Sequence, residues 1–104
     1  PNTIGFEVLK NHAAAFVSAP DWVSAKGMRT LGNPLNGDEK VISGESGAVT
    51  TGLLVAAMER EDLADLRKDL KLDENSRILL ISTEGDTDPD KYRSIVWDGE
   101  YPSI

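Results

Sequence analysis

The chain has 104 residues, with 18 acidic and 11 basic side chains and a formal charge of −7, a length that suits one domain over 1–104. The acidic balance excludes the basic surface that nucleic-acid binding needs, and no apolar stretch approaches the ~20 residues of a membrane-spanning helix. Because the chain has no Cys and His12 is its single His, it cannot form a disulfide or a thiolate or imidazole zinc site, and we expect a soluble, cytoplasmic protein.

The first part of the chain predicts two helices. Thr3 or Asn2 can cap a helix over 3–11, and the small apolar run at 13–18 fits either a buried strand or more helix. A Pro at the start and a Gly at the end predict a second helix over 20–32. A loop of turn-forming residues then follows.

The remaining elements alternate between strands and helices. A pair at 41–42 predicts a short strand, and the nearly all-apolar segment 48–58 predicts a helix buried on most sides. Leu residues at helical spacing over 63–70 predict an amphipathic surface helix, and the aliphatic run 78–81 predicts a strand buried on both faces. Asp88 and the Pro after it predict the start of a last helix. This alternation predicts an α/β fold.

The loop at 42–48 is the first candidate site. It joins a predicted strand to a helix N-terminus, where backbone N–H groups and the positive end of the helix dipole lie near the carboxylate of Glu45. The alternative interpretation is a plain helix cap, in which Ser43 or Ser46 caps the helix and the glycines only form the turn.

The loop at 81–88 is the second candidate site. Ligand crevices in open α/β sheets lie beyond the carboxyl ends of strands, so the hydroxyls of Ser82 and Thr83 are placed to meet a ring nitrogen or a phosphate. The alternative is an ordinary loop that ends at the Asp88 cap. Calcium is excluded, because a calcium loop that begins at Asp86 would need Gly at position 91 and Glu at position 97.

These two loops and their surroundings resemble the C-terminal part of the diaminopropionate ammonia-lyase family. The stretches that carry the resemblance are NPL at 33–35, VISGESGAV at 41–49, LLISTEGDTDP at 79–89 and IVWDG at 95–99. That family belongs to the fold-type II pyridoxal-phosphate (PLP) enzymes, with the tryptophan synthase β-subunit and the serine and threonine dehydratases. The resemblance therefore implies helices around a few short, mostly parallel strands.

The resemblance also implies the chemistry. The family removes both amino groups of 2,3-diaminopropionate and releases pyruvate and ammonia, with PLP as the electron sink for the carbanion at the α-carbon. In fold-type II enzymes a Ser or Thr hydroxyl bonds the pyridine nitrogen. Ser82 matches it in the pattern Ser-x-x-Gly-Asp-x-Asp, and Thr83 is the second choice. A hydroxyl does not force a proton onto that nitrogen as a carboxylate would, so elimination can outcompete transamination.

The first loop takes its implied role from the same resemblance. Glu45 matches an acid that lies beside the cofactor in related enzymes. Ser43, Gly44 and Gly47 would then shape the wall of the cofactor pocket.

Two parts of such an enzyme have no match in this sequence. The family's Schiff-base Lys and its glycine-rich phosphate cup lie nearer the N-terminus, and the lysines here stand in polar contexts that do not lower a Lys pKa. We therefore expect a C-terminal segment that is inactive alone, catalytic residues outside it, and a homodimer together with the remainder of the full-length chain. The expected substrate is a small amino acid.

Two rival interpretations stay open. One is a free-standing, non-enzymatic α/β module that binds a small anion at the turn over 44–48 or docks to a partner. The other keeps PLP and changes the substrate, as in a serine or threonine dehydratase. A Lys and a glycine-rich loop encoded upstream of Pro1 would favour an enzyme over the module.

Overall fold

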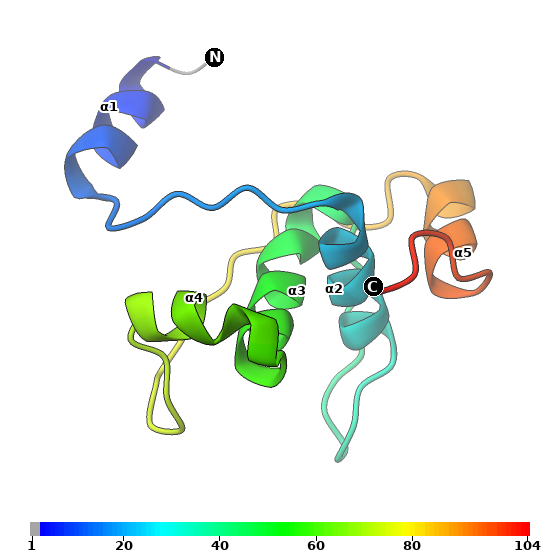
Figure 1. The fold of residues 1–104 in the computed structure, drawn as a ribbon. Helices are drawn as coiled ribbons and strands as arrows, with labels where there is room; N and C mark the ends of the chain where they lie inside the picture. The colour runs from blue at the N-terminus through cyan, green and yellow to red at the C-terminus, as the bar shows by residue number, and fades with distance from the viewer. Residues whose placement is uncertain (1–2) are drawn as a thin grey trace.

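The computed structural model describes residues 3–104, and this part of the chain folds entirely into helices and connecting segments (Figure 1). The α-helices are α1 (Thr3–His12), α2 (Asp21–Gly32), α3 (Glu45–Glu59), α4 (Ala64–Asp69) and α5 (Pro89–Val96), with a 3₁₀ turn η1 (Glu61–Leu63) before α4. Within this described part, none of the helices is long and apolar enough to cross a membrane.

The predicted α/β fold is wrong for this chain, because no strand forms among residues 3–104. The segments 41–42 and 78–81 are irregular chain, and their side chains are exposed, with Leu79 at 84%. An aliphatic run shows that a segment favours an extended, buried environment, but a strand exists only when a neighbouring strand supplies its backbone hydrogen bonds. Within the described residues no such neighbour is present.

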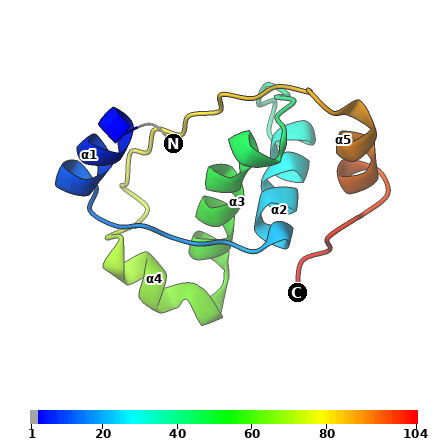
Figure 2. The same cartoon turned by 90° about the horizontal axis from the view of Figure 1, so that it is seen from above.

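Helix α1 lies apart from the other helices in both views, at the end of an extended connection (Figures 1 and 2). It confirms the predicted first helix, whereas the proposed cap at Asn2 lies outside the described residues. The apolar run at 13–18 forms neither the strand nor the helix that its sequence allowed, and Phe16 is 71% exposed.

Helices α2 and α3 pack side by side and form the centre of the molecule (Figure 2). Small residues set how closely they approach. A Cβ added to Gly27 would collide with the carbonyl oxygen of Ala48, and one added to Gly52 would collide with that of Val23. The two backbones are therefore in direct contact, which places the start of α3 and the loop before it firmly against α2.

Helix α5 completes the core from the other side of α2. Its buried residue Ile95 packs with Ala25, Met28 and Ala48, and Tyr92 packs against the same cluster. The predicted helix start is confirmed: the Oδ1 of Asp88 accepts a hydrogen bond of 3.1 Å from the Lys91 backbone N–H, and Pro89 is the first helical residue.

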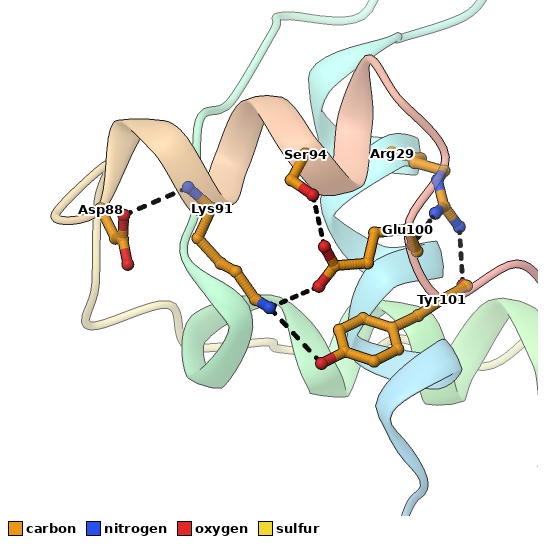
Figure 3. Close-up of polar contacts among 6 residues, drawn as sticks. All are labelled: Arg29, Asp88, Lys91, Ser94, Glu100 and Tyr101. Atoms are coloured by element: carbon orange, nitrogen blue, oxygen red, sulfur yellow. Dashed lines mark hydrogen bonds and ion pairs between the residues drawn. The ribbon is translucent and has the colours of Figure 1, made fainter.

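Arg29 ties the chain after α5 to α2. Its guanidinium donates to the backbone carbonyls of Ile95, Glu100 and Tyr101, two of which Figure 3 shows. Because Arg presents several donors in one rigid plane, a single side chain can hold three carbonyls together.

The predicted amphipathic helix over 63–70 forms in two parts, the turn η1 and the short helix α4. Arg67 donates to the carbonyl of Ala57 at 2.9 Å and so ties α4 to the end of α3. An apolar groove of about 200 Å³ lies beside them, lined by Thr50, Leu53, Leu54, Ala57, Leu70, Leu72, Ile78 and Leu80. Two side chains of the predicted second strand thus border α3 without forming a sheet.

Candidate functional site

The two candidate loops meet at the N-terminus of α3. Gly44 is the N-cap residue, with an extended backbone at φ −72° and ψ 176°, and its carbonyl accepts the Ala48 N–H at 3.1 Å. Its own N–H donates to the Glu84 carbonyl at 3.3 Å. Neither Ser43 nor Ser46 caps the helix by its side chain, so the plain-cap interpretation of these serines is wrong. The helix begins at Glu45, three residues before the predicted start at Ala48.

A pair of serine hydroxyls links the loops more closely. The Oγ of Ser43 lies 2.9 Å from the Oγ of Ser82, and both hydroxyls are within 3.3 Å of the Glu84 carbonyl oxygen. Ser43 also donates to the carbonyl of Gly44 at 3.1 Å. Ser43 is fully buried, whereas Ser82 belongs to an exposed part of the chain. One residue of the pair is therefore buried inside the fold, and the other lies in an exposed part of the chain with its Oγ held against the buried hydroxyl.

Gly47 makes room for this pair. A Cβ at position 47 would lie 2.5 Å from the Ser82 Oγ and 2.6 Å from the Ser43 Oγ. Those distances are far below van der Waals contact, so any larger residue at this position would displace one of the hydroxyls. We call Ser43, Gly47 and Ser82 the hydroxyl cluster.

A cavity of about 340 Å³ opens beside the same helix N-terminus. Gly44 and Glu45 line it, whereas Ser43, Gly47, Ser82 and Thr83 do not, and Thr83 is simply exposed. The full lining is Met28, Gly44, Glu45, Ser46, Glu84, Asp86, Thr87, Asp88, Lys91 and Tyr92. The structure thus divides the six predicted site residues between the cavity wall, the adjoining hydroxyl cluster and the exposed Thr83.

Carboxylates dominate the charge around the cavity. The lining contains one cation, Lys91, and four carboxylates, those of Glu45, Glu84, Asp86 and Asp88. Within residues 3–104, however, no group of three or more His, Asp or Glu side chains is arranged to hold a metal ion. Burial, together with the charge of Asp86, raises the pKa of the Tyr92 phenol, which keeps that side chain neutral.

Lys91 is held by the chain that follows α5. Its Nζ bonds the Glu100 carboxylate and lies 3.4 Å from the Tyr101 hydroxyl, and Ser94 bonds the other Glu100 oxygen (Figure 3). The hydrogen bond to Glu100 strongly raises the pKa of Lys91. Because a protonated amine is not a nucleophile, this cavity lysine is unsuited to forming a Schiff base.

Sequence reasoning missed both the Ser43–Ser82 pair and the network around Glu100. The two serines are 39 residues apart, and Arg29 lies 71 residues from Glu100, so no local pattern connects them. The only signal in the sequence is that each serine lies in one of the two loops predicted as candidate sites.

The sequence was compared with known proteins and protein families. No protein-family model matches the chain. Over 101 residues it is 48% identical to diaminopropionate ammonia-lyase of Escherichia coli strain K12, an alignment that covers 97% of this chain and 25% of the relative. The Salmonella typhimurium enzyme of the same name is 47% identical over 100 residues and is likewise covered for 25% of its length. The chain matches a segment of diaminopropionate ammonia-lyase.

The match to diaminopropionate ammonia-lyase extends to the fold. The crystal structure of the E. coli enzyme in complex with D-serine superposes with a TM-score of 0.92 at 47% identity, over 98% of this chain and 26% of that one. The apo form gives 0.91, and the complex with an aminoacrylate-PLP azomethine reaction intermediate gives 0.92. The resemblance read from the sequence is therefore confirmed. The chain spans about a quarter of the length of the curated relatives it matches.

Proposed function

We propose that this chain is part of a PLP-dependent lyase that converts 2,3-diaminopropionate to pyruvate and ammonia, and that it forms one wall of the cofactor pocket. The support is the 48% identity to diaminopropionate ammonia-lyase and the TM-score of 0.92 to an enzyme solved with an aminoacrylate-PLP intermediate. The remaining three quarters of such an enzyme would supply the Schiff-base Lys and the phosphate cup. The working enzyme would be a homodimer acting on a small amino acid.

Within this proposal, the Ser82 hydroxyl is the partner of the pyridine nitrogen. The observation that carries it is the position of Ser82, an exposed residue whose neutral Oγ is held 2.9 Å from the Oγ of the buried Ser43. That donor fits a pyridine nitrogen, which accepts one hydrogen bond in the ring plane. The residues of this chain thus suit one end of the cofactor ring, with Thr83 as the second candidate hydroxyl.

The cofactor and the residues around it would have distinct roles. PLP, when bound, supplies the electron sink that stabilises negative charge at the α-carbon of an amino acid. Ser82 keeps its proton on Oγ and donates it as a hydrogen bond, since a serine hydroxyl does not ionise near neutral pH. Glu45, in the first turn of α3, contributes the carboxylate of the pocket wall. Gly44 leaves space for the Glu84 side chain at the cavity, and Gly47 leaves space for the hydroxyls of Ser43 and Ser82.

Two substitutions of Ser82 in the full-length enzyme test this function. Ser82→Ala should alter the absorption of the bound cofactor and lower turnover while leaving the fold intact. Ser82→Asp should place a carboxylate against the ring nitrogen, favour its protonation and increase transamination relative to pyruvate release. An unchanged cofactor spectrum and unchanged kinetics in Ser82→Ala would refute the role of this hydroxyl.

The D-serine complex of the E. coli enzyme also supports a dehydratase as the second candidate. Rates of pyruvate release from diaminopropionate and from serine, measured on the same full-length protein, decide between the two. A large preference for diaminopropionate supports the ammonia-lyase, and a preference for serine supports the dehydratase. We expect the 104-residue chain alone to release no pyruvate from either substrate.

A further inference from the structure

We propose that Ser43 is a positioning residue that directs the Ser82 hydroxyl proton toward the ligand, an inference that rests on the proposed function of Ser82. The two oxygens are 2.9 Å apart, the distance of a normal hydrogen bond between hydroxyls. Ser43 is exposed neither to solvent nor to the cavity, because its accessible surface is 0% and it is absent from the cavity lining. Its effect on a ligand must therefore pass through Ser82.

The number of protons makes the direction of this hydrogen bond important. Each hydroxyl has one proton to donate, and the acceptors within reach are the carbonyl oxygens of Gly44 and Glu84 and the other hydroxyl. If Ser82 donates to Ser43, it has no proton left for a ring nitrogen. If Ser43 donates to Ser82, the Ser82 proton is free to point outward.

Donation from Ser43 also makes Ser82 a stronger donor. Hydrogen bonds in a chain polarise one another, so a hydroxyl that accepts one bond donates its own proton more effectively. For the Ser43 proton the competing acceptors are the carbonyl oxygens of Gly44 at 3.1 Å and Glu84 at 3.3 Å. Both are farther away than the Ser82 Oγ at 2.9 Å and lie beyond the usual O–H···O range, as does the Glu84 carbonyl for the Ser82 proton at 3.3 Å. A ligand nitrogen at normal distance would outcompete it.

The surroundings hold this arrangement in place. Because Ser43 is buried, water does not replace its hydrogen bonds, and leaving its hydroxyl unpaired would carry a desolvation penalty. Gly47 closes off the remaining space, since even a methyl group there would reach within 2.6 Å of both oxygens. The hydroxyl cluster is thus ordered before any ligand arrives.

The test uses the full-length holoenzyme with Ser43→Ala, Ser82→Ala and the double variant. Ser76→Ala is the matched control, because it removes a serine hydroxyl that also makes a 2.9 Å hydrogen bond, to the Asp73 N–H. The measurements are the absorption of bound PLP, the dissociation constant of PLP titrated into the apo-enzyme, and kcat and KM for diaminopropionate. The first two measurements do not depend on activity.

We expect Ser43→Ala to shift the cofactor absorption in the same direction as Ser82→Ala and to lower kcat about tenfold, the effect of one hydrogen bond. KM for diaminopropionate should change less than twofold. The double variant should match Ser82→Ala alone, because Ser43 acts only through Ser82. Ser76→Ala should match the parent.

Three results would overturn the inference, and they are distinguishable. If Ser82→Ala changes the enzyme but Ser43→Ala behaves like Ser76→Ala, Ser43 has no positioning role and the function proposed for Ser82 stands. If the two effects multiply in the double variant, Ser43 acts independently of Ser82. If Ser82→Ala is itself silent, the proposed function fails first.

A second pair of variants separates the hydroxyl from its packing if Ser43→Ala folds poorly. Ser43→Thr and Ser43→Val add nearly the same volume to the buried position, and only Thr keeps a hydroxyl. Ser43→Thr should retain a spectrum closer to the parent, and Ser43→Val should reproduce the spectrum of Ser82→Ala. Identical spectra for Thr and Val would overturn the inference.

Discussion

Substituting Gly52 by Ala probes the contact on which the helical core depends. Gly52 lies in α3, where a Cβ would collide with the Val23 carbonyl oxygen and lie 2.9 Å from the Gly27 nitrogen. All of these atoms belong to the backbone of α2. Because backbone atoms cannot rotate aside as a side chain can, the two helices would have to separate.

The expected loss of stability follows from two opposing contributions. Overpacking a core typically costs 1–3 kcal/mol, and a contact with rigid backbone belongs at the upper end, about 3 kcal/mol. Replacing Gly by Ala within a helix contributes about 1 kcal/mol in the favourable direction. The net destabilisation is about 2 kcal/mol, which changes the folding equilibrium about 30-fold.

Urea unfolding followed by far-ultraviolet circular dichroism measures this difference between Gly52→Ala and the parent chain. Thr50→Ala is the control, because Thr50 is exposed on the same helix and its loss should change stability by less than about 0.5 kcal/mol. If Gly52→Ala proves as stable as the parent or more stable, α2 and α3 do not approach as closely as described and the reasoning fails.

Two further predictions concern α5. Asp88→Ala should destabilise the chain by about 1 kcal/mol by removing the hydrogen bond to the Lys91 N–H, whereas Asp88→Asn, which keeps an acceptor, should cost much less in the same unfolding assay. The hydrogen bond from Lys91 lowers the pKa of Glu100 from its ordinary value of 4.5. The ionised Glu100 therefore stabilises the fold fully above pH 4.5, and this stabilisation is lost as the pH falls through the lowered pKa. Melting temperatures measured between pH 7 and pH 3 should therefore fall less steeply in Glu100→Gln than in the parent, and parallel curves would contradict the pairing.

The helices were predictable because their signals are local. Pro20 and Gly32 bound α2, Asp88 and Pro89 begin α5, and each signal acts through the backbone of its own turn. The 3₁₀ turn at the start of the 63–70 helix and the earlier start of α3 at Glu45 were not predicted. Helix ends depend on packing as much as on sequence, which makes them harder to place.

The prediction of strands was wrong because a strand, unlike a helix, depends on distant residues. The run at 78–81 has the composition of a buried strand, but a strand needs a neighbour, and the described residues supply none. The proposed site shows the same division. Ser82 and Glu45 could be predicted as site residues from the sequence of their loops. The contact of Ser82 with Ser43, in contrast, depends on the path of the chain between them.

The sequence by itself therefore determined the positions of the helices, the residue types at both loops and the relationship to diaminopropionate ammonia-lyase, since all of these are carried by the order of neighbouring residues. Only the tertiary structure decided that the described chain is helical and that Ser43, Gly47 and Ser82 share one cluster beside an acidic cavity. Hydrogen bonds between residues distant in sequence form only when the fold brings their atoms within about 3 Å, and here the chain after α4 returns Ser82 to the loop before α3.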